Sequence, residues 1–148
     1  MKKAIIVCLI LILIVEVFFT INMNALKEVS GHGILDSTIQ NSQGYYDIIS
    51  SYGDEGFRVY KNIRRVDMVF PLIYGLLLIL LLKQVGFKYY WLPLVASLFD
   101  ISENLLIGRM LNAYPDQLDV GLLLSSLIFI KFSIILVSFV TYLARRRR

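Results

Sequence analysis

Four long apolar segments decide what this sequence can fold into. They cover about residues 4–21, 66–83, 89–111 and 120–144. A helix needs roughly 20 residues to cross the hydrocarbon core of a bilayer, and the first, third and fourth segments are long enough by themselves. The second is shorter, but Arg64, Arg65 and Asp67 can extend toward the interface at its outer end. The pattern predicts an all-α integral membrane four-helix bundle.

Composition excludes most other classes of protein. Of the 148 residues, 57% are hydrophobic and 18% charged, whereas soluble domains average about 45–50% and about 25%. An ordinary soluble enzyme and a disordered chain are therefore excluded. The single cysteine, Cys8, excludes a disulfide scaffold and a dithiol redox enzyme. With one histidine, we expect no metal site and no cofactor, and residues 1–148 are predicted to form a single membrane domain.

The first segment also has features of a cleaved signal peptide. Lys2 and Lys3 precede a long apolar run, as in the basic start of a signal sequence. However, Glu16 interrupts that run, and Met23-Asn24-Ala25 lacks the small first residue of a cleavage site. We therefore expect this segment to be retained as the first spanning helix.

Basic residues gather on one side of the predicted bundle. They are Lys2, Lys3, Lys83, Lys88 and Arg145, Arg146, Arg147 and Arg148, and no acidic residue accompanies them. The other side receives a connector of mixed sign, residues 22–65, and an acidic turn, residues 112–119. The positive-inside rule then predicts a plasma-membrane protein with both termini cytoplasmic. The basic C-terminus indicates contact with membrane lipids and not with nucleic acid.

The connector contains signals for two amphipathic helices. Ser42 is predicted to cap a helix that ends at Tyr52 and Gly53, and Asp54 to cap the helix that follows. We expect both helices to lie on the outer leaflet surface. They would either cover the outer end of the bundle or form a lid over a site that opens there.

Five ionisable residues lie inside the predicted spans. They are Glu16, Asp67, Asp100, Glu103 and Lys131. Each costs about 2.5–3.5 kcal/mol at the bilayer centre, so such residues are expected to face the bundle interior and to pair. At about 1.5 Å per residue, all five lie about 18–24 Å from the basic edge. They are therefore predicted to form one polar layer, slightly outward of the midplane.

The third span supplies most of this layer. Asp100, Glu103 and Asn104 are three and four residues apart and share one helix face. Lys131 is the natural counter-charge, and Tyr74 can donate its phenol hydroxyl. These residues, with Glu16 and Asp67, form the candidate ligand-binding site.

Three functions are compatible with such a layer. The leading hypothesis is a site for a proton-coupled or cationic, partly apolar small ligand. The second is a lipid-modifying or isomerising enzyme that uses Asp100 and Glu103 as catalytic acid and base. The third is a structural or assembly subunit in which the layer is only an interhelical clasp. Of these classes, an enzyme is the less favoured one. The sequence is compatible with an oligomer.

Several resemblances bear on the fold. Glu16-Val17-Phe18-Phe19-Thr20 resembles the first helix of small multidrug resistance exporters, although the long connector, Lys131 and the Asp100/Glu103 pair depart from that family. Four helices with buried acids resemble EXPERA-type sterol isomerases and sigma-2 receptor proteins, without a shared motif. A group of uncharacterised small bacterial membrane proteins is similar over nearly the whole chain, which implies the four-span fold and no activity. The segments that carry this last resemblance are Gly33-Ile34-Leu35-Asp36, Gly56-Phe57-Arg58-Val59-Tyr60, Asp67-Met68-Val69-Phe70-Pro71-Leu72-Ile73-Tyr74 and Asp100-Ile101-Ser102-Glu103-Asn104.

Overall fold

The computed structural model describes residues 1–37 and 39–147, and it contains helices and no strand within those ranges. The helices are α1 (Lys2–Ser30), the short 3-10 helix η1 (Leu35–Ser37), α2 (Ser42–Ser51), α3 (Gly53–Asp67), α4 (Phe70–Gln84), α5 (Leu92–Ala113) and α6 (Gly121–Arg146). The all-α prediction is confirmed. Arg148, the last residue of the predicted basic block, lies outside the described residues.

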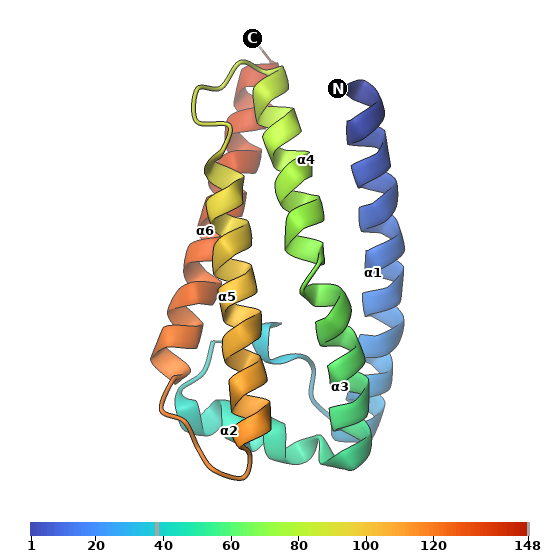
Figure 1. The fold of residues 1–148 in the computed structure, drawn as a ribbon, viewed down its shortest axis with the longest axis vertical. Helices are drawn as coiled ribbons and strands as arrows, with labels where there is room; N and C mark the ends of the chain where they lie inside the picture. Colours follow the sequence, from blue (N-terminus) through green and yellow to red (C-terminus); the bar gives the residue numbers. More distant parts are fainter. Residues whose placement is uncertain (38, 148) are drawn as a thin grey trace.

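The long helices lie side by side with their axes roughly aligned (Figure 1). Both termini lie at one end, here called the terminal end, and α2 crosses the opposite end, here called the α2 end. Within the described residues, three helical stretches are long and apolar enough to cross a membrane: Lys2–Ser30, Gly53–Gln84 and Gly121–Arg146. These stretches indicate a membrane protein.

The structure differs from the predicted connector at both of its ends. Helix α1 continues to Ser30, where Gly31 adopts a left-handed φ of 73° and ends it. Helix α3 packs along α1 and continues the line of α4, whereas α2 crosses the end of the bundle (Figure 1). The reason is its buried face of Gly56, Tyr60 and Ile63, which covers apolar residues of the neighbouring elements.

The predicted helix caps also need correction. Asn41, and not Ser42, caps α2, because its side chain accepts a hydrogen bond from the Gly44 backbone N–H. The Ser42 hydroxyl instead donates to Asp119 at 2.7 Å and accepts from the Gly121 N–H at 2.9 Å. Ser42 therefore joins α2 to the start of α6. Asp54 makes no side-chain cap of α3.

Pro71 explains why α3 and α4 are separate helices. Proline has no N–H, so the Asp67 carbonyl four residues earlier loses its helical partner. The Asn104 side-chain amide on α5 donates to that carbonyl at 3.4 Å. The break after Asp67 is thus tied to α5 at the level of the predicted polar layer.

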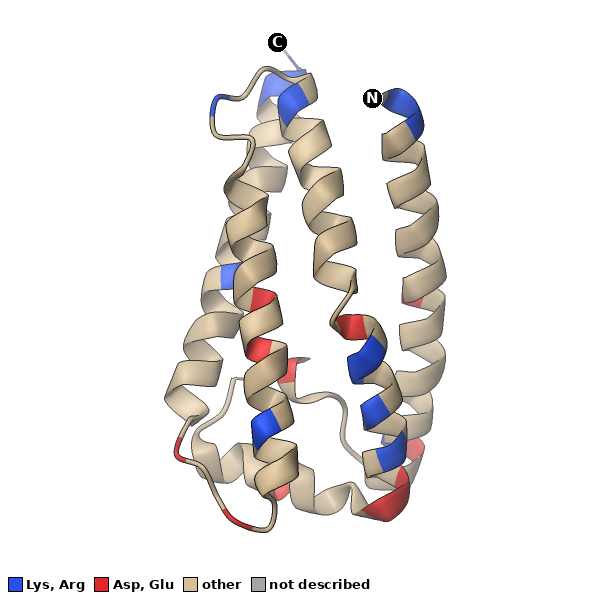
Figure 2. Cartoon of the chain, viewed as in Figure 1, with Lys and Arg blue, Asp and Glu red and all other residues tan. Residues whose placement is uncertain are grey.

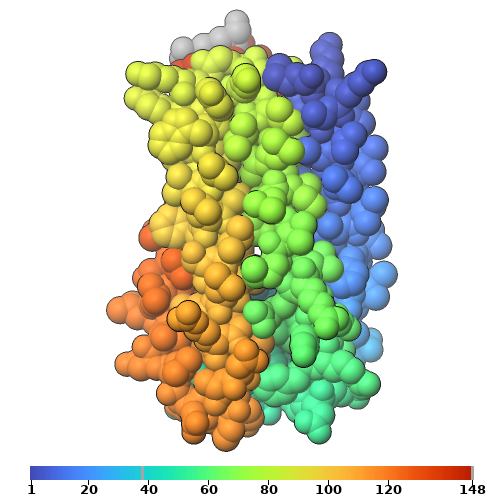
Figure 3. All heavy atoms as spheres, viewed as in Figure 1, coloured from blue at the N-terminus to red at the C-terminus, as the bar shows by residue number. Residues whose placement is uncertain are grey.

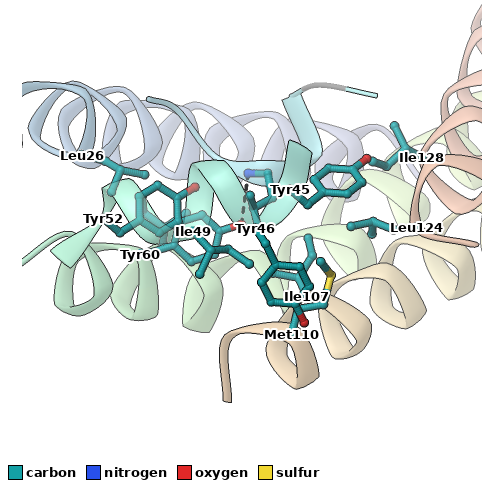
Figure 4. Packing of buried hydrophobic residues seen from close by; sticks show 12 residues of the cluster. Leu26, Tyr45, Tyr46, Ile49, Tyr52, Tyr60, Ile107, Met110, Leu124 and Ile128 are labelled. Atoms are coloured by element: carbon teal, nitrogen blue, oxygen red, sulfur yellow. Dashed lines mark hydrogen bonds between the residues drawn. The ribbon is translucent and has the colours of Figure 1, made fainter. Parts of the chain in front are cut away.

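A tyrosine-rich core closes the α2 end (Figure 4). Tyr45, Tyr46, Tyr52 and Tyr60 are each at most 2% exposed. The Tyr52 hydroxyl donates to the Gly33 carbonyl at 2.7 Å, Tyr60 accepts from the Leu35 N–H and Tyr46 from the Leu118 N–H. Buried tyrosines with satisfied hydroxyls hold the connector onto the helices.

The other half of the molecule is covered with apolar side chains. Side chains of α4 and α5 interlock along one face, with α1 beside α4 (Figure 3). Gly75 allows this close approach, because a Cβ there would collide with the Ser97 hydroxyl. Large apolar residues such as Ile14 on α1 and Leu136 on α6 are 61% and 63% exposed. An apolar exterior of this kind is what a hydrocarbon environment requires.

Candidate functional site

Lys131 on α6 is the centre of a buried cluster of charges. Its Nζ lies 2.8 Å from Glu103 Oε2, 3.1 Å from Asp100 Oδ1 and 3.7 Å from Asp36 Oδ2. Lys131 is 3% exposed, Asp100 5% and Glu103 1%. The structure therefore brings together the predicted counter-charge and both predicted carboxylates of α5.

Asp100 is also the main hydrogen-bond acceptor of the site. Tyr74 on α4 donates its phenol hydroxyl to Asp100 Oδ2 at 2.8 Å. Asn104, one turn along α5, donates to Asp100 Oδ1 at a long 3.5 Å. Charge-assisted contacts of this kind hold a carboxylate in one orientation. Asn104 was predicted to share the helix face of Asp100 and Tyr74 to donate its phenol hydroxyl, and the structure brings both side chains to Asp100.

The sequence of α5 explains why these groups converge. Ser97, Asp100, Glu103 and Asn104 recur at helical spacing and are all buried, while Leu98 and Leu105 on the opposite face are about half exposed. The Ser97 hydroxyl donates to the Pro71 carbonyl at 2.6 Å, which fixes α5 against the start of α4.

A cavity of about 390 Å³ adjoins this cluster. Its polar lining consists of Asp36, Asp67, Tyr74, Asp100 and Lys131. The rest of its wall is apolar, formed by Phe19, Ile34, Ile63, Phe70, Leu77, Leu78, Phe132 and Ile135. Phe132, one of these lining residues, is 53% exposed, so this part of the cavity wall also forms the outer surface of α6. We call this space the acidic cavity.

Asp67 and Glu103 lie differently with respect to the acidic cavity. Asp67, at the end of α3, lines it, as predicted. Glu103 does not line it: its side chain is enclosed and paired with Lys131. The two α5 carboxylates, predicted as a pair, thus have different access to a molecule in the cavity.

Asp36 is a site residue that the sequence analysis missed. It belongs to η1, which folds back toward the helices so that Leu35 is fully buried and Asp36 reaches Lys131. Burial raises the pKa of the Asp36 carboxyl above its usual range, while the Lys131 ammonium acts against this shift. The only feature of the sequence that could have indicated a buried Asp36 is its position directly after Ile34 and Leu35 in a loop that contains Gly33.

Glu16 is the predicted site residue that the structure leaves out. It is exposed on α1 and does not line the acidic cavity. The inward stripe of α1 runs from Cys8 through Phe19 to Leu26, and Glu16 falls outside it. Equal depth along the helix therefore did not bring Glu16 to the other charged residues, because the rotation of α1 turns its side chain away from them.

The charges of the cluster do not balance. Three carboxylates, Asp36, Asp100 and Glu103, surround one ammonium, and Asp67 adds a fourth carboxylate at the cavity wall. The nearby Arg64 makes no ion pair with any described residue, and its Nη2 donates to the Asn104 carbonyl at 3.2 Å. Buried charges are stable only when paired, so the site has capacity for protons or a further cation.

Comparison with known proteins assigns no family to the chain. No family model matches it, and no curated protein or solved structure matches it either.

Proposed function

We propose that the acidic cavity binds a cationic, partly apolar small molecule and exchanges it for protons. One observation carries this proposal: an apolar cavity of about 390 Å³ whose polar wall holds three carboxylates and one ammonium. A cationic group would balance the excess negative charge, and the aromatic wall suits an organic substituent. A proton can occupy the same carboxylates when the cation is absent.

The proposed ligand reaches the cavity from the bilayer. The tyrosine-rich core closes the α2 end, whereas Phe132 borders the cavity at the exposed surface of α6. We therefore propose lateral access in place of a site that opens at the outer end under a connector lid. An amphipathic cation concentrates at the membrane interface, which suits such a path.

The proposal includes a four-span plasma-membrane protein with both termini cytoplasmic. Helix α5 carries Asp100, Glu103 and Arg109, but it packs against both α4 and α6, and both of its carboxylates are buried between them. Lys and Arg gather at the terminal end without acidic residues, and most acidic residues lie toward the α2 end (Figure 2). Both observations support α5 as a fourth span in this orientation.

Topology is tested by cysteine labelling in a Cys8→Ala background. Gln40→Cys is expected to react with a membrane-impermeant maleimide added outside intact cells, and Lys88→Cys only after lysis. The opposite pattern would refute the orientation.

Ligand binding is tested with two probes of the same shape and opposite charge, tetraphenylphosphonium and tetraphenylborate. We expect the cation to raise the melting temperature of the detergent-solubilised protein and the anion to leave it unchanged. A ligand at 100 times its Kd stabilises by about 2.7 kcal/mol. Ile135→Trp fills the acidic cavity and should abolish the shift, whereas Ile130→Trp, outside the cavity lining, should retain it. Equal shifts for both probes would contradict the proposal.

The clasp remains a second candidate, because the ion pairs of Lys131 join α6 to α5 and to the connector. The enzyme hypothesis has less support. Glu103 does not line the acidic cavity, and its proposed partner Asp100 already accepts hydrogen bonds from Lys131 and Tyr74.

A further inference from the structure

A second cavity, of about 420 Å³, lies between α3 and the last turns of α5. It is lined by Phe57, Arg58, Lys61, Arg64, Leu111 and Asn112. Three of these six residues are cationic and none is acidic, so its charge is opposite to that of the acidic cavity. We call it the basic groove.

The sequence of α3 places the three cations on one face. Arg58, Lys61 and Arg64 follow each other at intervals of three residues, which is the spacing of neighbours along a helix surface. None of them forms an ion pair with a residue that the structure describes; Lys131 alone does so there. Asp54 and Glu55, in the first turn of α3, do not line the groove. The positive charge of the groove is therefore available to a ligand.

The guanidinium of Arg64 also indicates that the groove can hold a hydrogen-bond acceptor. Its Nε is buried and has no hydrogen-bond partner among the described residues. Its guanidinium lies so close to Gly108 on α5 that any Cβ there would collide with Nη2. A buried N–H without a partner costs free energy unless a ligand or water supplies an acceptor. An anion with several oxygen atoms in the groove would meet this need.

The groove also lies at the level where lipid headgroups begin. This step rests on the proposed topology, in which Lys83 marks the cytoplasmic edge. At about 1.5 Å per residue, Arg64 lies about 28 Å from Lys83, Lys61 about 33 Å and Arg58 about 38 Å. The hydrocarbon core is about 30 Å thick, so the three cations follow the outer boundary into the headgroup region.

We propose that the basic groove binds the phosphate group of an anionic phospholipid in the outer leaflet. Arg58 and Arg64 offer planar guanidinium groups, which match phosphate oxygens in pairs, and Lys61 adds a mobile point charge. Phe57 and Leu111 offer apolar contact to the glycerol and the first acyl carbons. A soluble phosphate compound carries the same anionic group but lacks this apolar part.

The experiment compares phosphate sources in dodecyl maltoside, a detergent without phosphate. Melting temperature is followed while dioleoyl phosphatidylglycerol, dioleoyl phosphatidylcholine or inorganic phosphate is titrated in. The variants are the double change Arg58→Gln with Lys61→Gln, and Arg65→Gln as control. Arg65 is an exposed cation on the same helix that does not line the groove. Arg64 is left unchanged because it packs against α5.

We expect phosphatidylglycerol to stabilise the wild type and the control most strongly. The double variant should bind it about 30-fold more weakly, since each basic side chain near an anionic lipid contributes about fivefold. Equal binding by all three proteins would overturn the groove as the site. Equal stabilisation by inorganic phosphate would overturn the lipid as its occupant, and equal stabilisation by phosphatidylcholine would overturn selection for an anionic headgroup. The far-UV circular dichroism of the double variant verifies that it is folded.

Discussion

Replacing Lys131 by Met removes the one ammonium that the described part of the chain places within 4 Å of Asp36, Asp100 and Glu103. Its distances to these carboxylates, 3.7, 3.1 and 2.8 Å, correspond to about 4–6 kcal/mol of attraction each at an effective dielectric constant of about 20. Desolvation of the buried ions offsets most of that gain, and breaking a buried pair has a net cost of about 3–5 kcal/mol. We therefore expect Lys131→Met to unfold at a clearly lower temperature than the wild type.

The size of the effect follows from the length of the chain. For about 150–250 residues, 1 kcal/mol changes the melting temperature by about 2–4 °C, so the expected loss is about 6–20 °C. The measurement is thermal unfolding in dodecyl maltoside at pH 7.5, followed by circular dichroism. Lys88→Met, which removes an exposed lysine at the terminal end, is the control and should leave the melting temperature unchanged.

A compensating variant tests the physical reason. Combining Lys131→Met with Asp100→Asn and Glu103→Gln neutralises the two carboxylates closest to the lost ammonium and leaves only Asp36 of the three, and replacing both members of a buried pair is often neutral. The triple variant should regain at least half of the lost melting temperature. The reasoning is refuted if the single variant melts within about 2 °C of the wild type, or if the triple variant melts no higher than the single one.

Three further predictions concern the rest of the chain. Gly121→Ala should destabilise by about 1–3 kcal/mol, because a Cβ there would collide with the backbone of Ser42; Gly33→Ala, with only ordinary contacts, is the control, and equal melting temperatures would contradict this packing. Asp36→Asn should gain stability over the wild type as pH rises: a pKa raised in the folded state means that stability present at low pH is lost as pH rises through that pKa. Melting curves between pH 4 and 8 test this, and a gain that shrinks with rising pH would contradict it. Glu16→Gln should leave tetraphenylphosphonium binding in equilibrium dialysis unchanged, since Glu16 does not line the acidic cavity. A loss of binding would show that Glu16 belongs to the binding site.

Local patterns of residues predicted the part of the site that lies on one helix. Asp100, Glu103 and Asn104 share a face because helical periodicity depends only on spacing, and Lys131 was predicted as their counter-charge from its depth. Depth predicts contact only when the helix is also rotated inward. That condition holds for Lys131 and fails for Glu16, whose rotation depends on which residues of α1 pack against the neighbouring helices.

The helical class, the apolar segments, the separation of basic and acidic ends and the polar face of α5 can be predicted from residue order, because each follows from composition or from spacing along the chain. Three features appear only in the folded chain: α3 continues the line of α4, η1 brings Asp36 to Lys131, and α3 and α5 enclose the basic groove. These features depend on contacts between residues far apart in the chain. Packing of the connector against the helices selects them, and no local pattern encodes that packing.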